Sequence, residues 1–205
     1  RLLGVVACSL HRANPDSRVE RLLADEEPSI RARTLRLAGE LGRLDLRDLV
    51  RPALKDEDNA CRFWAAWSAG LLGDRAQAIP ALRLHATGGD FRRRALDLVI
   101  RLMDRDTAID WLRELGQDRG QMRSLIVGAG ILGDPIVVPW LIRKMSVPAL
   151  ARVAGESFSM ITGVDLSDSK LDGSSPEGFE GGPSDEPSDE KVSMDPDEHL
   201  PWPDA

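Results

Sequence analysis

The sequence has little of what most enzymes and secreted proteins depend on. It contains two cysteines, Cys8 and Cys61, three histidines and no tyrosine. Two distant cysteines without a CxxC spacing support neither a disulfide framework nor a zinc site, and both are expected to be buried helix residues. No apolar run approaches the length of about eighteen residues that a membrane span needs, and no signal peptide pattern opens the chain. We therefore expect a cytoplasmic protein.

Catalytic motifs are also absent. The sequence has no GxSxG, HExxH, P-loop or GxGxxG pattern. His11, His85 and His199 lie in different segments, with no paired nucleophile and no ligand spacing. Glu156 and Asp165 are explained as helix and turn residues. We therefore expect no enzyme activity, no metal and no cofactor in these residues.

Negative charge is concentrated at one end of the chain. Residues 167–205 hold twelve acids against two lysines, a net charge of −10, whereas the whole chain carries −7, so residues 1–166 carry +3. The segment 167–205 is rich in Ser, Pro, Gly and acids, a composition that buries too little surface to offset chain entropy. Because the chain starts at Arg1 and stops after Ala205 without a terminating element, we expect a fragment of a longer protein.

What the sequence does contain is an internal repeat. GLLGDRAQAIPAL (70–82) returns as GILGDPIVVPWL (130–141), with a weaker copy at IRLMDRDTAIDWL (100–112). In rows of about thirty residues, small or apolar residues follow each row start at a spacing of i, i+4, i+7, which predicts one amphipathic helix per row. The row starts are Arg31, Arg62, Arg92, Met122 and Arg152.

Each predicted helix is followed by a turn and a second helix. Gly42, Gly73 and Gly133 follow the last apolar position of their rows, where a C-cap residue in the left-handed conformation ends a helix. Asp74 and Asp134 come directly after two of these glycines and are N-cap candidates. The second helices are marked early by Pro52, Pro80, Asp110 and Pro139. Residues 1–29 indicate a divergent first row and 149–163 the first helix of a last one.

These hairpins must stack to share a core. The sequence thus predicts an all-α fold, an α-solenoid of about five stacked helical hairpins over residues 1–166, with an irregular acidic tail at 167–205.

Two resemblances follow from these motifs. The pattern of Arg, small apolar residues, LGD and (A/V)xPAL resembles the short HEAT-like repeats of phycocyanobilin lyase relatives, best at 61–90 and 121–149. AGESFSMITGVDL (154–166), Leu171-Asp172 and DPDEHLPWPD (195–204) resemble a bacterial HEAT-repeat family found beside type VI secretion genes. The first resemblance implies a common scaffold. The second implies a link to type VI secretion but brings no catalytic residue.

Candidate contact residues fall into two groups. Trp64 and Trp67 occupy positions that are charged in the neighbouring rows, so we expect them on the outward side of a helix, either covered or binding a partner. The second group is basic and lies on the second helices, where it either forms a stripe facing a groove or is simply solvated. Its members are Lys55, Arg83, Arg113 and Arg143.

Two further predictions concern contacts within the chain. The row-opening arginines are expected to bridge adjacent repeats by pairing with inter-helix acids such as Asp74 or Asp104, with phosphate or partner binding as the alternative. The tail is either a solvated linker or a segment that runs back over the arginine face of the solenoid. In the second case its anchors are Phe179, Leu200 and Trp202.

The sequence therefore favours a non-enzymatic protein-binding scaffold, with an effector or toxin as partner and the role of a type VI secretion adaptor or immunity protein. The alternative is a nucleic-acid-binding protein with an Arg-lined concave groove, which the modest charge of +3 disfavours. A bilin-lyase-like role rests on fold analogy alone. Adaptor and immunity roles remain equal alternatives, and the oligomeric state is left open.

Overall fold

A computed structural model describes residues 1–15, 18–179 and 195–204 of the chain. Within these ranges the fold is helical apart from one two-stranded pairing. The chain divides into two compact units, Arg1–Thr107 and Ala108–Ala205. The predicted division into a solenoid at 1–166 and a tail at 167–205 stays a prediction, since the division by compactness falls elsewhere.

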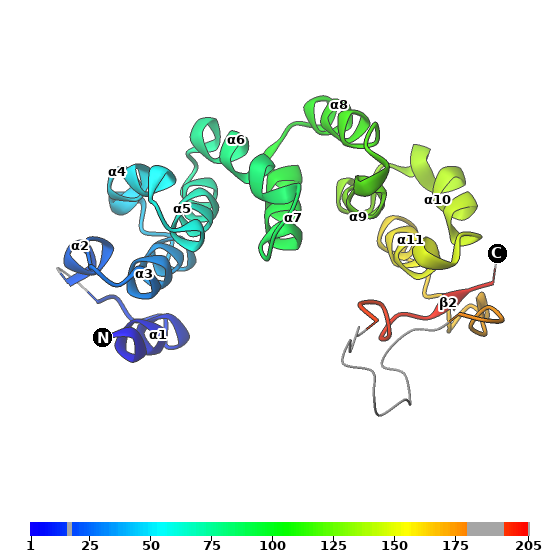
Figure 1. Cartoon of the computed structure of the whole chain (residues 1–205), viewed down its shortest axis with the longest axis horizontal. Helices are drawn as coiled ribbons and strands as arrows, with labels where there is room; N and C mark the ends of the chain where they lie inside the picture. Colours follow the sequence, from blue (N-terminus) through cyan, green and yellow to red (C-terminus); the bar gives the residue numbers. More distant parts are fainter. Residues whose placement is uncertain (16–17, 180–194, 205) are drawn as a thin grey trace. The chain divides into compact units, whose positions relative to one another are not determined.

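The first unit is a series of helices that alternate between two layers (Figure 1). One layer holds α3 (Pro28–Glu40), α5 (Asn59–Leu71) and α7 (Arg92–Leu102), with α3 against α5 and α5 against α7. The other holds the second helices, α4 with its flanking 3-10 turns and α6. Their bounds, with those of the two N-terminal helices, are α1 Leu2–Leu10, α2 Arg18–Leu23, η1 Leu44–Leu46, α4 Arg47–Val50, η2 Arg51–Lys55 and α6 Arg75–Ala86.

The second unit continues the same alternation. α8 (Arg105–Leu115), which begins just before the division, and α10 (Val138–Met145) are second helices, while α9 (Met122–Leu132) and α11 (Pro148–Thr162) are first helices packed against each other. Two 3-10 turns precede α9 and α10, and a two-residue antiparallel pairing closes the unit. These are η3 Arg119–Gln121, η4 Pro135–Val137, β1 Asp172–Gly173 and β2 Trp202–Pro203.

The helix ends follow from local sequence chemistry. Asp58 caps α5 by accepting the Cys61 N–H at 2.8 Å, and Asp134 accepts the Ile136 N–H at 3.1 Å ahead of η4. α9 ends at Gly133, whose φ of 75° is the left-handed conformation that glycine adopts without penalty. Asp74 is the N-cap residue of α6, as predicted, although its side chain makes no capping hydrogen bond, whereas the predicted place of Pro80 early in the helix is wrong because Pro80 lies inside α6.

Apolar side chains between the layers form the core. In the first unit Leu35, Phe63 and Leu82 are almost fully buried, and in the second Ile126 and Leu141 are. Burial of one such side chain stabilises the fold by about 1.5–3 kcal/mol. A helix pair stacked on the next helix pair, with a shared core, defines an α-solenoid, so the predicted all-α, α-solenoid fold class is confirmed.

Close approach of neighbouring first helices depends on pairs of small residues. Gly39 of α3 faces Ser68 of α5, and Gly130 of α9 faces Ser157 of α11. Each serine hydroxyl donates to a carbonyl of the facing helix, Ser68 to Leu35 O at 2.6 Å and Ser157 to Ile126 O at 3.0 Å. The same small-residue contact therefore sets the helix spacing in both units.

Candidate protein-interaction surfaces

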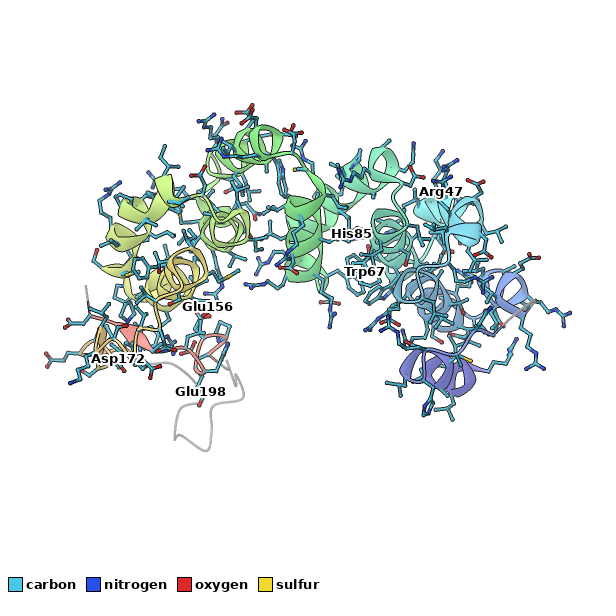
Figure 2. All side chains as sticks on the ribbon, turned by 180° about the vertical axis from the view of Figure 1, so that it is seen from behind. Arg47, Trp67, His85, Glu156, Asp172 and Glu198 are labelled. Atoms are coloured by element: carbon cyan, nitrogen blue, oxygen red, sulfur yellow. The ribbon has the colours of Figure 1, made fainter. Side chains whose placement is uncertain are left out.

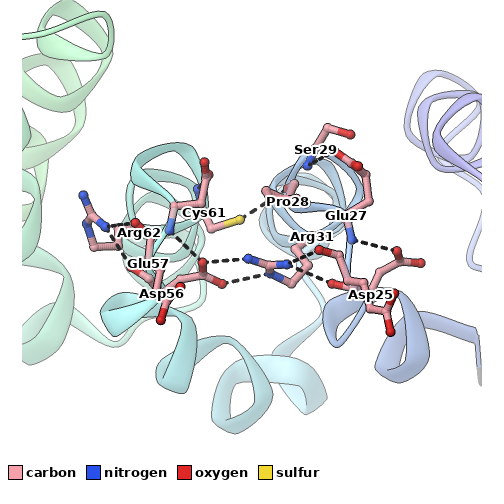
Figure 3. Close-up of polar contacts among 11 residues, drawn as sticks. Asp25, Glu27, Pro28, Ser29, Arg31, Asp56, Glu57, Cys61 and Arg62 are labelled. Atoms are coloured by element: carbon pink, nitrogen blue, oxygen red, sulfur yellow. Dashed lines mark hydrogen bonds and ion pairs between the residues drawn. The ribbon is translucent and has the colours of Figure 1, made fainter.

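Arg31, near the start of α3, links its hairpin to the next one (Figure 3). Arg31 binds both carboxylate oxygens of Asp56, with Nε to Oδ2 at 2.9 Å and Nη2 to Oδ1 at 2.8 Å. Its Nη1 also donates to the carbonyls of Asp25 and Glu26, at 2.9 and 3.0 Å. The pKa of Asp56 lies below its usual value because Arg31 hydrogen-bonds to the carboxylate, and the pKa of Arg31 is raised by the same contact.

The bridging role expected of the row-opening arginines thus exists at Arg31, but with different acids. Asp74 pairs instead with Arg51 at 2.9 Å, and Asp104 accepts hydrogen bonds from Thr107. Arg62 donates to the carbonyls of Asp56 and Glu57, at 2.8 and 2.7 Å. The expectation named Asp74 and Asp104 because they occupy the turns inside hairpins, whereas Asp56 lies in the turn between hairpins.

The two cysteines differ in burial. Cys61 is fully buried, with its Sγ 3.3 Å from the Pro28 carbonyl oxygen, and burial together with nearby Asp56 raises its pKa to about 12. Cys8 is half-buried. The Cys61 thiol is therefore not activated as a nucleophile, since activation requires a lowered pKa.

Aromatic side chains of α5 form a cluster with the turn after α6. Phe63 stacks on Phe91 with ring centroids 4.2 Å apart and an interplanar angle of 7°. Trp64 meets Trp67 edge to face at 5.4 Å. His85 of α6 lies 5.4 Å from Phe63, and its pKa is lowered by burial and, secondly, by the charge of Arg62. Figure 2 labels Trp67 and His85 on the two neighbouring helices.

Trp64 does not project into solvent. Trp64 is 9% exposed, because Phe91 and Trp67 pack against it and the Arg36 guanidinium lies 4.6 Å from its ring centroid. Trp67 and Phe91 are half-buried and form the accessible edge of the cluster. Of the two open alternatives for the indoles, Trp64 is therefore covered by its own chain, and a partner role for Trp67 stays a prediction.

Sequence reasoning missed the residues that follow this cluster. Arg92, Arg93 and Arg94 are all exposed and form the first turn of α7, directly after Phe91. α7 has no acid in its first turn and no side-chain cap on its N-terminal N–H groups. Positive charge at the positive end of a helix dipole costs stability. The signal available in the sequence was the run FRRR (91–94) itself, which the repeat alignment treated as a row start.

The four basic residues of the second helices are divided between the two units, with two in each. Lys55 is exposed and lines a cleft of about 350 Å³ with Glu20, Leu49 and Pro52, whereas Arg83 is half-buried. In the second unit Arg113 pairs with Asp110 at 2.9 Å, and Arg143 is exposed. Their alignment as one stripe stays a prediction.

The described part of the tail lies against α9 and α11. The rings of Phe179 and Trp202 meet at 4.7 Å, and the Arg152 guanidinium lies 4.4 Å from the Trp202 centroid and 5.6 Å from that of Phe179. Leu200 is half-buried, and its N–H donates to Asp197 O at 2.8 Å. The structure thus brings two of the proposed anchors, Phe179 and Trp202, together on Arg152, one of the row-opening arginines.

Other features that would indicate chemistry are sparse. No group of three or more His, Cys, Asp or Glu suited to a metal ion occurs among the residues that the structure describes. In the same residues, no helix combines the length and the apolar character that crossing a membrane would require. A cleft of about 690 Å³ opens between α1 and α2, lined by Cys8, Arg18 and Arg21 among others.

The fold defines an α-solenoid built of helical hairpins, and the comparison with known proteins gives the class of repeat. Residues 15–101 match the family described as HEAT repeats, so this part of the chain is similar to HEAT repeats. No curated protein matches the chain. No solved structure matches it either.

Proposed function

We propose that the chain is a non-enzymatic protein-binding scaffold, and that its first unit binds an acidic protein segment at the arginine edge of the aromatic cluster. We define this surface by Trp67, Phe91 and the arginines 92–94. HEAT-like repeats serve as scaffolds for protein partners, which supports the general role. The placement of the surface is supported by one observation above the others, the three exposed arginines at the uncapped start of α7.

The positive charges at the start of α7 are not balanced by an acid in the same turn. Three like charges at the positive end of α7 destabilise the isolated chain, each by about 0.3–1 kcal/mol. A carboxylate-rich ligand would gain from the same geometry, because the helix dipole and the guanidinium forks both favour anions. Asp90, immediately before the cluster, offsets only part of this charge. The half-buried rings of Trp67 and Phe91 supply apolar area beside the charges, which suits a short peptide segment.

The test compares stability with binding in the full chain. In Arg92→Gln/Arg93→Gln/Arg94→Gln the like charges are removed, so the chain should become more stable and lose its partner. The matched control is Arg47→Gln/Arg75→Gln, since both residues are exposed at the starts of α4 and α6 (Figure 2 labels Arg47). Retention is measured by quantitative mass spectrometry of proteins captured on each full-chain variant.

Trp67→Ala provides the second arm. It removes the accessible indole without touching the charges, and it should weaken capture of the same partner. A partner held equally by the wild type, the triple variant and Trp67→Ala would show that the surface is misplaced. If the triple variant loses both capture and stability, the three arginines do not destabilise the free chain, and the reason given for placing the surface there fails.

The sequence resemblance to a secretion-associated family supports a more specific role. Because AGESFSMITGVDL (154–166) and DPDEHLPWPD (195–204) resemble a family found beside type VI secretion genes, we propose a secretion effector or toxin as the partner, and a cytoplasmic location. Adaptor and immunity roles predict different captured proteins: a secretion component in the first case, a toxin whose activity the chain blocks in the second.

Nucleic acid is the second candidate ligand, since arginines beside aromatic rings also suit a phosphate backbone and stacked bases. The acidic segment 167–205 opposes it. A fluorescein-labelled DNA duplex titrated with the full chain at 50 mM and 200 mM salt separates the classes, because phosphate binding falls steeply with salt. Tight binding at low salt, lost in the triple arginine variant, would favour nucleic acid over a protein partner.

A further inference from the structure

Residues 195–200 reproduce the start of a first helix. DEEPSI (25–30) leads into α3, DEDNAC (56–61) leads into α5, and DPDEHL (195–200) lies in the tail. In each, the N–H of the third residue donates to Oδ1 of the first: Glu27 to Asp25 at 3.1 Å, Asp58 to Asp56 at 2.9 Å and Asp197 to Asp195 at 2.9 Å. The three segments therefore share one turn, an Asx turn closed by the leading aspartate.

Each leading aspartate also forms an ion pair with an arginine. Asp25 pairs with Arg1 at 2.6 Å, Asp56 with Arg31 at 2.8 Å, and Asp195 with Arg152. Each arginine belongs to the start of the preceding first helix, although Arg152 is the fifth residue of α11 whereas Arg31 is the fourth of α3. The sixth position is apolar in every copy: Ile30 and Cys61 are buried, and Leu200 is half-buried.

The tail segment thus takes, on α11, the place that the next hairpin takes on α3. Its contacts are more extensive than those of an exposed ion pair. The side chains of Arg152 and Asp195 are 7% and 10% exposed, and Asp197, 6% exposed, accepts from Arg123 of α9 at 2.7 Å. Trp202 and Phe179 cover the Arg152 guanidinium, and the Asp204 N–H donates to the Leu171 carbonyl at 2.8 Å.

Charge and burial make this arrangement specific. An arginine buried among aromatic rings is costly unless a carboxylate pairs with it. The hydrogen bonds from Arg152 and from the Asp197 N–H hold the pKa of Asp195 below its usual value, so the carboxylate is charged at neutral pH. An Asp-to-Asn change would keep the shape of the turn while removing the charge that Arg152 requires.

We propose that Arg123 and Arg152, with the ring of Phe179, form a binding site for an acidic helix-start turn of pattern Asp-x-(Asp/Glu)-x-x-apolar, and that the chain's own residues 195–204 occupy it in cis. The site lies on α9 and α11 of the second unit, so it is separate from the surface proposed for the first unit. The two arginines give the site its specificity for an acidic turn, and residues 195–204 are the ligand bound in the structure.

The test uses the full chain and a synthetic, fluorescein-labelled peptide of residues 195–204, DPDEHLPWPD, with fluorescence polarisation as the readout. In Asp195→Asn/Asp197→Asn the chain's own segment is disabled, so the site is open and the peptide binds in trans. Wild type should bind the peptide at least about tenfold more weakly, because a tethered competitor acts at an effective concentration of the order of 1 mM. Glu198→Gln, exposed in the same segment (Figure 2), should behave as wild type.

A peptide with Asn at both acid positions should bind neither protein. The proposal is overturned if the double variant does not bind the acidic peptide, or if both proteins bind both peptides equally. The first result would show that the tail segment is an integral part of the fold and not a replaceable ligand. The second would show that binding depends on apolar contacts and not on the two acids.

A second measurement avoids substitution of the acids. The wild-type chain is labelled with 5-fluorotryptophan, and the Trp202 signal is assigned from Trp202→Phe. Unlabelled acidic peptide at the order of 1 mM should move about half of the Trp202 ¹⁹F signal to a displaced position, since it then matches the tethered segment. The Asn peptide should leave the signal in place. An unchanged signal with both peptides refutes occupation by a displaceable ligand.

Discussion

Gly39→Ala should destabilise the first unit, although alanine is the better helix former. A Cβ at position 39 would lie 2.5 Å from Ser68 Oγ and 2.9 Å from Ser68 Cα. The hydroxyl can rotate away, but the Cα is backbone, so α3 and α5 must move apart. Rotation of the hydroxyl also breaks its 2.6 Å hydrogen bond to the Leu35 carbonyl.

The expected loss follows from these terms. Overpacking between two helices costs about 1–3 kcal/mol, and the lost hydrogen bond adds about 1 kcal/mol. Replacing glycine within a helix returns about 1 kcal/mol. The free energy of unfolding should therefore fall by about 2 kcal/mol, a decrease in Tm of about 4–8 °C for a chain of this size.

The assay is urea unfolding followed by tryptophan fluorescence and far-UV circular dichroism. Gly4→Ala is the matched control, because nothing lies within 4 Å of a Cβ built at Gly4 of α1, and it should raise stability by about 0.5 kcal/mol. Gly130→Ala, where the Cβ would lie 3.0 Å from Ser157 Cα, should lower stability like Gly39→Ala. Equal stabilisation by Gly39→Ala and Gly4→Ala would refute the close-approach reasoning.

Three further predictions concern titratable groups. The Arg31 contact lowers the pKa of Asp56, so its contribution to stability is present above the unfolded value of about 3.9 and is lost as the pH falls through the lower folded value. Unfolding free energies from pH 7 down to pH 2 should show this slope in wild type and a smaller one in Asp56→Asn. Burial raises the pKa of Cys61 to about 12, so iodoacetamide at pH 8 should label Cys8 faster than Cys61 in the folded chain, and equal labelling rates would contradict this. Burial and the charge of Arg62 lower the pKa of His85, so its neutral form is favoured by folding and this stability is lost as the pH falls below about 6.5. An NMR titration of the imidazole with a midpoint above that value would disprove the assignment.

The fold was predictable because its determinants are local. The spacing of Ala65, Ala69 and Leu72 and the glycine at position 133 each specify a helix face or a helix end within one row. Pro80 was misplaced because it was aligned with Pro52 and Pro139, which lie at helix starts, although the N-cap candidate Asp74 already puts the start of α6 at Arg75 and the proline in its interior.

The candidate sites were less predictable because they depend on residues from several rows. The neighbouring rows predict an outward position for Trp64, but Arg36 of α3 and Phe91 after α6 help to cover it. Likewise, Asp195 has no partner at any repeat spacing. Its relation to Arg152 becomes visible only once DPDEHL (195–200) is compared with DEDNAC (56–61) in space.

The glycine–serine contact between first helices has a consequence for how such a chain can change during evolution. Gly39 meets a serine in the following helix, and Gly130 meets one in the same way. A duplicated or recombined segment that begins after such a glycine and ends with another carries a serine at its front and a glycine at its rear. Both of its new junctions then find a complementary neighbour. The glycine–serine contact thus allows whole hairpins to be gained or lost between these two positions, while each new junction keeps a glycine opposite a serine.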